Sequence, residues 1–133
     1  MNRIVVAAAI IDDTSRMLLL AQRRYPPEVA GLWELPGGKV EDGESRRSSL
    51  EREIAEELGT AIEAGEQVGA AVVLRPGLEL VALRARLAGP PPRALDHTAL
   101  CWVDAGRLRA MAAAGELVPA DTAWEPDLLE LLA

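Results

Sequence analysis

Blocks of apolar residues separated by polar turns and prolines predict short strands in the first third of the chain. Residues 4–11 form a continuous apolar run, which is typical of a strand buried on both faces of a sheet. The polar residues 12–15 and the apolar run 17–21 that follows them predict a hairpin. The prolines at 26–27 predict a loop, because proline cannot continue a helix or a central strand. Residues 33–38 are expected to form a short extended segment that ends in two glycines.

The pattern over residues 45–58 predicts a helix, with Ser45 as a candidate N-cap and Gly59 as the residue that ends it. The other expected elements are strands over 67–74, 78–87 and 99–103, a helix over 105–114 capped by Asp104, and a final helix that starts with the capping-box pair Thr122 and Glu125. Strands and helices interleave, which predicts an α/β sandwich around a mixed sheet. No repeat or linker interrupts the 133 residues, so a single domain over 1–133 is expected.

Charge and composition limit the partners. The net charge of −7 argues against a nucleic-acid polymer as partner, because such binders need a basic surface. No apolar run approaches the roughly 18–20 residues that span a bilayer, so no membrane partner is expected. The chain enters a strand-like run without a signal pattern, and its single cysteine, Cys101, excludes an internal disulfide. We therefore expect a cytoplasmic protein, acting as a monomer or a weak homodimer.

The helix over 45–58 carries an acidic stripe. Glu53, Glu56 and Glu57 are spaced i, i+3 and i+4, so their carboxylates share one face. The adjacent face is apolar and is expected to pack on the core: Leu50, Ile54 and Leu58. Like charges at this spacing repel by a few tenths of a kcal/mol per pair, roughly, which a bound cation would relieve. A hard divalent cation with oxygen ligands fits, and the alternative is an ordinary solvated acidic face.

The residues around this stripe resemble the Nudix box, G-x5-E-x7-R-E-U-x-E-E-x-G-U, where U is a bulky aliphatic residue. The matching positions are Gly38, Glu44, Arg52, Glu53, Ile54, Glu56, Glu57 and Gly59. Only Thr60, at the last aliphatic position, departs from the pattern, and we interpret it as a packing detail. Eight matches across 22 positions make a far stronger indication than a lone glycine motif.

Segments outside the box are similar to MutT proteins and to CTP pyrophosphohydrolases, namely residues 22–41, 96–103 and 119–121. Membership of the Nudix family implies an α/β/α sandwich and hydrolysis of a nucleoside diphosphate that is linked to a further group. In the MutT branch, water attacks the β-phosphorus of a nucleoside triphosphate and gives a monophosphate and pyrophosphate.

The resemblance also implies a metal centre. The Gly37 carbonyl, Glu53, Glu56 and Glu57 would hold Mg²⁺ or Mn²⁺, joined by Asp96 from a loop that is stiffened by prolines. The alternative for Asp96 is a loop-capping aspartate. Bound metal polarises phosphoryl oxygens and activates water. Either Glu53 or Glu44 would be the general base, although a bidentate ion pair with Arg52 is an equal alternative for Glu44.

Substrate contacts are expected from residues outside the box. By resemblance, Arg23 contacts phosphate, although it could be a surface arginine and Arg24 could replace it. Asp121 occupies a position that reads the base in MutT, and a carboxylate there accepts the N4 amine of cytosine or the extra N7–H of 8-oxoguanine. Its alternative is an N-cap of the last helix. Leu78 is a candidate wall for the base.

The substrate remains open at this point. The candidates are CTP or dCTP, 5-methyl-dCTP and 8-oxo-dGTP. An enzymatic alternative is a Nudix hydrolase of ADP-ribose or of dinucleoside polyphosphates. A non-catalytic, nucleotide-binding Nudix domain is the alternative from another class, although such domains should have lost box carboxylates and none is missing here.

Overall fold

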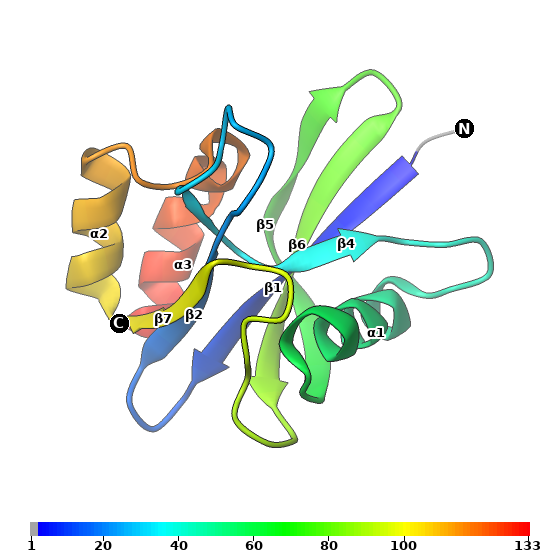
Figure 1. The fold of residues 1–133 in the computed structure, drawn as a ribbon, viewed down its shortest axis with the longest axis horizontal. Helices are drawn as coiled ribbons and strands as arrows, with labels where there is room; N and C mark the ends of the chain where they lie inside the picture. The colour runs from blue at the N-terminus through cyan, green and yellow to red at the C-terminus, as the bar shows by residue number, and fades with distance from the viewer. Residues whose placement is uncertain (1–2) are drawn as a thin grey trace.

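The computed structural model describes residues 3–133, which fold into one mixed sheet with helices on both sides. The strands are β1 (Arg3–Asp12), β2 (Met17–Gln22), β3 (Trp33–Glu34), β4 (Gly37–Lys39), β5 (Ile62–Arg75), β6 (Leu78–Leu87) and β7 (Ala99–Val103). Their order is β3-β2-β1-β6-β5, with β4 paired to β1 and β7 paired to β2. β1 is parallel to β6 and antiparallel to β2 and β4, which makes the sheet mixed (Figure 1).

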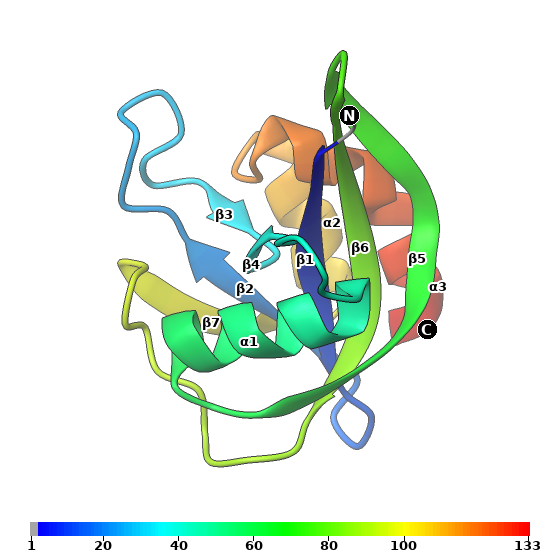
Figure 2. The same cartoon turned by 90° about the vertical axis from the view of Figure 1, so that its right-hand side faces the viewer.

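The helices are α1 (Arg46–Leu58), α2 (Ala105–Ala113), the 3₁₀ turn η1 (Pro119–Trp124) and α3 (Glu125–Leu132). Figure 2 shows α1 on one side of the sheet and α2 and α3 on the other. β1 contributes side chains to the core on both faces of the sheet, since alternate side chains of a strand point to opposite faces. On the α1 side it contributes Val6, Ala8 and Ile10, and on the other side Ala7, Ala9 and Ile11. The predicted α/β sandwich and the doubly buried first strand are both confirmed.

α1 begins and ends where the sequence predicts. The Ser45 hydroxyl accepts a hydrogen bond from the N–H of Ser48, and Gly59 closes the helix with φ of 63°. Leu50, Ile54 and Leu58 are fully buried against the sheet, which leaves the acidic stripe on a neighbouring face. Thr60 is also buried, and its hydroxyl donates to the carbonyl of Pro90, so it anchors the proline loop.

Two predicted boundaries were wrong. β5 begins at Ile62 rather than at residue 67, because backbone pairing with β6 continues through a stretch whose exposed glutamates obscure the strand pattern. α3 begins at Glu125 without the predicted capping box, since the Thr122 hydroxyl donates to the carbonyl of Pro119 inside η1. Pro126, in the first turn of α3, favours a helix start there because its missing N–H needs no partner.

No helix within residues 3–133 combines the length and apolar character that crossing a membrane requires.

Candidate active site

The two glycines before the acidic helix allow a close approach between β4, β1 and α1. In the pairing of β4 with β1, Gly37 lies opposite Ala7 and Gly38 lies opposite Val6. A Cβ at Gly37 would clash with the carbonyl oxygen of Val6, and a Cβ at Gly38 would clash with the carboxylate of Glu53. The Glu53 side chain therefore lies directly on β4, beside the residue predicted to offer a carbonyl ligand.

Arg52 lies among the carboxylates of this face. Its Nε and Nη2 donate to the two oxygens of Glu44 at 2.8 and 2.9 Å. Its Nη1 donates to Glu53 at 3.1 Å and lies 3.4 Å from both oxygens of Glu56. Its Nη2 also donates to the carbonyl oxygen of Lys39 at 3.3 Å. One guanidinium thus compensates three of the predicted site carboxylates.

The pairing with Arg52 limits what Glu44 can do. These hydrogen bonds lower the pKa of Glu44 to about 2, and the same contact raises the pKa of Arg52. A general base works best when its pKa lies near the operating pH, so a carboxylate held this low is a weak proton acceptor. Of the two interpretations offered for Glu44, the geometry favours the ion pair and leaves Glu53 as the candidate base.

Of the acidic stripe formed by Glu53, Glu56 and Glu57, only Glu57 forms no ion pair with Arg52 within residues 3–133. Its Oε2 is buried and has no hydrogen-bond partner among residues 3–133. Burial, reinforced by the charges of Glu53, Asp96 and Glu34, raises the pKa of Glu57 to about 8. A buried carboxylate without donors is costly in its charged form, so this atom needs either a proton or a cation.

The loop before β7 brings Asp96 to Glu57. The N–H of Arg93 donates to the carbonyl of Leu58 at 2.8 Å, and the N–H of Leu95 donates to the carbonyl of Glu57 at 3.1 Å. These are end carbonyls of α1, which have no partner within a helix. By satisfying them, the loop places Asp96 close enough for its charge to act on Glu57.

Glu57 and Asp96 line one small cavity together with Arg23, Arg24, Tyr25, Glu34 and His97. Three of the predicted site residues therefore share this cavity. Glu34 and His97 had no role assigned from the sequence, although they are central to it. The carboxylate of Glu34 accepts from Nη1 of Arg23 at 3.1 and 3.3 Å and lies 3.0 Å from Nε2 of His97. The available clues were that His97 is the only histidine and that Glu34 stands next to the glycine segment.

Asp121 lies close enough to Glu34 to be affected by its charge and is almost completely buried. One carboxylate oxygen accepts from the N–H of Leu35 at 2.7 Å. Burial raises the pKa of Asp121 to about 7, opposed by the Leu35 hydrogen bond and supported by the charge of Glu34. It caps neither η1, where Val118 is the N-cap, nor α3, where Trp124 is. The helix-cap interpretation of Asp121 is therefore wrong.

Glu56 and Leu78, two further predicted site residues, do not line the small cavity. The side chain of Glu56 is 59% exposed, and its one hydrogen-bonding partner among residues 3–133 is Arg52. Leu78 begins β6, opposite Arg3 of β1, where it is partly buried at the end of the β5–β6 hairpin. That Leu78 packs against the nucleotide base therefore stays a prediction, which no contact supports.

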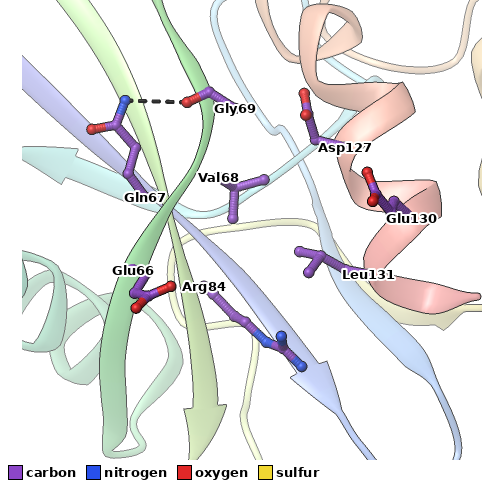
Figure 3. Close-up of a pocket in the computed structure, with 8 residues that line it drawn as sticks. All are labelled: Glu66, Gln67, Val68, Gly69, Arg84, Asp127, Glu130 and Leu131. Carbon is purple, nitrogen blue, oxygen red and sulfur yellow. Dashed lines mark hydrogen bonds between the residues drawn. The ribbon is translucent and has the colours of Figure 1, made fainter.

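A wider hollow between β5 and α3, about 300 Å³ in volume, is a poor place for phosphate (Figure 3). Its charged lining is mostly acidic, from Glu66, Asp127 and Glu130. The arginine that lines it, Arg84, is paired with Asp13 at 3.1 Å. These carboxylates would repel a triphosphate, so we assign no part of the active site to this hollow.

The carboxylate oxygens around Glu57 are of the chemical type that binds a divalent cation. Carboxylate oxygens are the ligands of hard cations, and the buried Oε2 of Glu57 has no hydrogen-bond donor among residues 3–133. Within residues 3–133, no three acidic, histidine or cysteine side chains converge closely enough to coordinate one ion. Glu53 and Glu56 are instead turned to Arg52. Metal binding through these two carboxylates would require them to exchange Arg52 for the cation.

Comparison with known proteins decides the family. The NUDIX domain model matches residues 1–121 of the chain. This chain belongs to the Nudix family. The match confirms the resemblance drawn from the box, and with it the expected fold and the assignment as a hydrolase of phosphoanhydride bonds. Nudix hydrolases generally need a divalent metal, which agrees with the carboxylate face of α1.

Similar proteins place this Nudix hydrolase near the MutT type. It is 47% identical over 135 residues to the putative 8-oxo-dGTP diphosphatase 2 of Mycobacterium tuberculosis, covering 99% of this chain and 92% of that protein. It is 52% identical over 68 residues to the CTP pyrophosphohydrolase of Escherichia coli, covering 51% of this chain and 50% of that protein. The solution structure of the E. coli ORF135 protein matches with a TM-score of 0.79 and 35% identity, covering 100% of this chain and 93% of that one.

Proposed function

We propose that this Nudix enzyme is a Mg²⁺-dependent pyrophosphohydrolase that cleaves a (deoxy)nucleoside triphosphate to the monophosphate and pyrophosphate. The observation that carries the proposal is the cavity in which Glu57 and Asp96 face the same space as Arg23. It combines a buried carboxylate oxygen that has no hydrogen-bond partner among the described residues with a guanidinium whose Nη2 makes no hydrogen bond there, and a metal-bound triphosphate needs both kinds of group.

Each side chain has a distinct part in this proposal. Glu57, Asp96, Glu53, Glu56 and the Gly37 carbonyl are the residues that would hold the metal. Bound metal would neutralise phosphate charge and lower the pKa of a coordinated water. Glu53 accepts the proton of the attacking water, because Arg52 lowers the pKa of Glu44 too far for that carboxylate to be an effective base. Arg23 binds the phosphate chain through guanidinium donors.

Asp121 reads the base in this proposal. Its second carboxylate oxygen makes no hydrogen bond among the described residues, while the first is held by Leu35. When ionised, Asp121 accepts the N4 amine of cytosine but meets the O4 of uracil with a lone pair. An unpaired buried acceptor costs roughly 1–3 kcal/mol, or about 5- to 150-fold in kcat/KM. CTP or dCTP should therefore exceed UTP, and 8-oxo-dGTP satisfies Asp121 through its N7–H.

The names of two relatives support these two substrate classes. One is called a CTP pyrophosphohydrolase and the other a putative 8-oxo-dGTP diphosphatase. Both classes leave Asp121 paired, so the geometry at Asp121 favours them equally over UTP. Relative kcat/KM values have to separate them.

The test is a substrate panel at pH 8, where Asp121 is largely ionised. CTP, dCTP, 5-methyl-dCTP, 8-oxo-dGTP, dGTP, UTP and ADP-ribose would be compared by kcat/KM with Mg²⁺, with products separated by anion exchange. In H₂¹⁸O, attack on the β-phosphorus puts the heavy oxygen into pyrophosphate, and attack on the α-phosphorus puts it into the monophosphate. Faster turnover of ADP-ribose than of every triphosphate would overturn the proposal.

Asp121→Ala tests the base-reading step separately. We expect it to flatten the CTP-to-UTP ratio while leaving the Mg²⁺ dependence unchanged. If the variant keeps the wild-type ratio, the base is read by another residue and Asp121 has a structural role.

A further inference from the structure

Two of the three guanidinium nitrogens of Arg23 donate hydrogen bonds within the protein. Its Nε donates to the carbonyl of Tyr25 at 3.0 Å, and its Nη1 donates to both oxygens of Glu34. Its Nη2 has no hydrogen-bond partner among residues 3–133, although the side chain lines the cavity with Glu57 and Asp96. A guanidinium has five N–H donors in a fixed planar fork, so fixing two nitrogens fixes the direction of the third.

Glu34 is itself fixed by His97. Nε2 of His97 lies 3.0 Å from Oε2 of Glu34, and the side chains are only 5% and 14% exposed. An ionised carboxylate only accepts hydrogen bonds, so His97 must carry a proton on Nε2 and donate it. The backbone of His97 is held as well, because its carbonyl accepts from Nη2 of Arg24 at 3.1 Å.

Glu34 would otherwise be difficult to keep in place. Its carboxylate lies near the carboxyl groups of Glu57 and Asp121, whose pKa values it helps to raise. Like charges in a partly buried site repel, so Glu34 would turn away without donors on more than one side. Arg23 holds it from one side and His97 from the other.

We propose that His97 is a positioning residue that, through Glu34, fixes the Arg23 guanidinium so that its Nη2 donors are left free for the phosphate chain. The proposal rests on the role of Arg23 in the proposed function and deepens it. In this role His97 acts through Glu34 and not on the substrate or the metal directly. Its effect is that Arg23 is already oriented before the triphosphate arrives, so less ordering is lost on binding.

The first test follows the guanidinium itself, without substrate. In protein with ¹⁵N-labelled arginine, the Nη1 and Nη2 resonances of Arg23 should be separate, because the ion pair with Glu34 hinders rotation. His97→Leu should merge them. His97→Gln, whose amide can reach Glu34, should keep them separate, and the shorter His97→Asn should merge them while retaining a polar side chain. Separate resonances in both the Leu and Asn variants would overturn the proposal.

The second test measures anion binding by titration calorimetry with inorganic pyrophosphate in metal-free buffer. We expect His97→Leu and His97→Asn to weaken binding about tenfold and His97→Gln to weaken it less than about threefold. With Mg²⁺ and CTP, KM should rise by a similar factor while kcat changes less. In an Arg23→Ala background the His97 effect should vanish, because nothing remains to be positioned.

These outcomes separate His97 from the proposed function. A His97→Leu penalty that is equally large in the Arg23→Ala background, or a glutamine variant as impaired as the leucine variant, would overturn the positioning role. Absence of pyrophosphate release from every triphosphate would instead overturn the proposed function, and the Arg23 resonances would still decide whether His97 fixes the guanidinium.

Discussion

The buried carboxyl of Asp121 makes the stability of this protein depend on pH in a way that one substitution should expose. Asp121→Asn keeps the size of the side chain and an oxygen that can accept from the N–H of Leu35. It removes only the charge. We expect the variant to be as stable as the wild type near pH 4 and clearly more stable at pH 8.

The magnitude follows from the pKa of Asp121. Burial raises it from 3.8 to about 7, whereas in the unfolded chain it should lie near 3.9, roughly. Between these values the folded protein holds a proton that the unfolded chain has lost, so stability falls as pH rises from about 4 to 7 and stays low above that. Three units at about 1.4 kcal/mol each give a ceiling of about 4 kcal/mol. We expect about 2–4 kcal/mol in favour of the asparagine variant at pH 8.

Urea denaturation of both proteins at pH 5, 6, 7 and 8 measures this difference. The raised pKa of Glu57 affects both proteins equally and cancels. Asp42→Asn, at an exposed aspartate, is the matched control and should change stability by no more than about 0.5 kcal/mol at each pH. A difference between Asp121→Asn and wild type that is flat from pH 5 to 8, or that favours the wild type at pH 8, would refute the reasoning.

Four further substitutions test the metal face. Glu53→Gln should lower kcat by at least about 10² with unchanged thermal unfolding, and near-normal turnover at saturating Mg²⁺ would exclude Glu53 from the site. Asp96→Asn should raise the Mg²⁺ concentration for half-maximal activity by about tenfold, and an unchanged requirement would leave Asp96 as a loop residue. Gly38→Ala should lower kcat by displacing the Glu53 carboxylate at little cost in stability. Gly37→Ala should destabilise the fold by about 3 kcal/mol or more, because its Cβ meets backbone, and equal unfolding midpoints for the two alanine variants would contradict this.

The sequence predicted the regular elements because their patterns are local. The caps Ser45 and Gly59, the apolar stripe of α1 and the alternating faces of β1 all follow from neighbouring residues. The prediction failed at the start of α3 because Thr122 had two possible partners, and only the tertiary path of η1 selects the Pro119 carbonyl. The capping-box spacing alone could not distinguish them.

The acidic ligand candidates were predictable for the same reason, and their environments were not. The spacing of Glu53, Glu56 and Glu57 on one helix is a local property. Which of them pairs with Arg52 and which is buried without a partner depends on β4 and on the loop before β7. The contact between Glu34 and His97 joins residues 63 positions apart, and no pattern in the chain predicts it.

Two arginines compensate most of the carboxylates at this site. Arg52 compensates Glu44, Glu53 and Glu56, and Arg23 compensates Glu34. Glu57 has no such partner, and a pKa of about 8 means that it keeps its proton at neutral pH. A divalent cation that binds here must therefore displace a proton from Glu57, and this coupling can be measured.

At pH 7, a group with a pKa of about 8 is about 90% protonated, so binding of one metal ion should release about 0.9 proton. Metal affinity should accordingly rise up to about tenfold per pH unit below 8 and level off above it, because above that pH no proton remains to be displaced. Calorimetric titration with Mn²⁺ in two buffers of different ionisation enthalpy counts the released protons directly. Glu57→Gln should bind Mn²⁺ more weakly and release almost none. Equal heats in both buffers for the wild type would mean that Glu57 is already ionised before the metal arrives, and that another group compensates its buried oxygen.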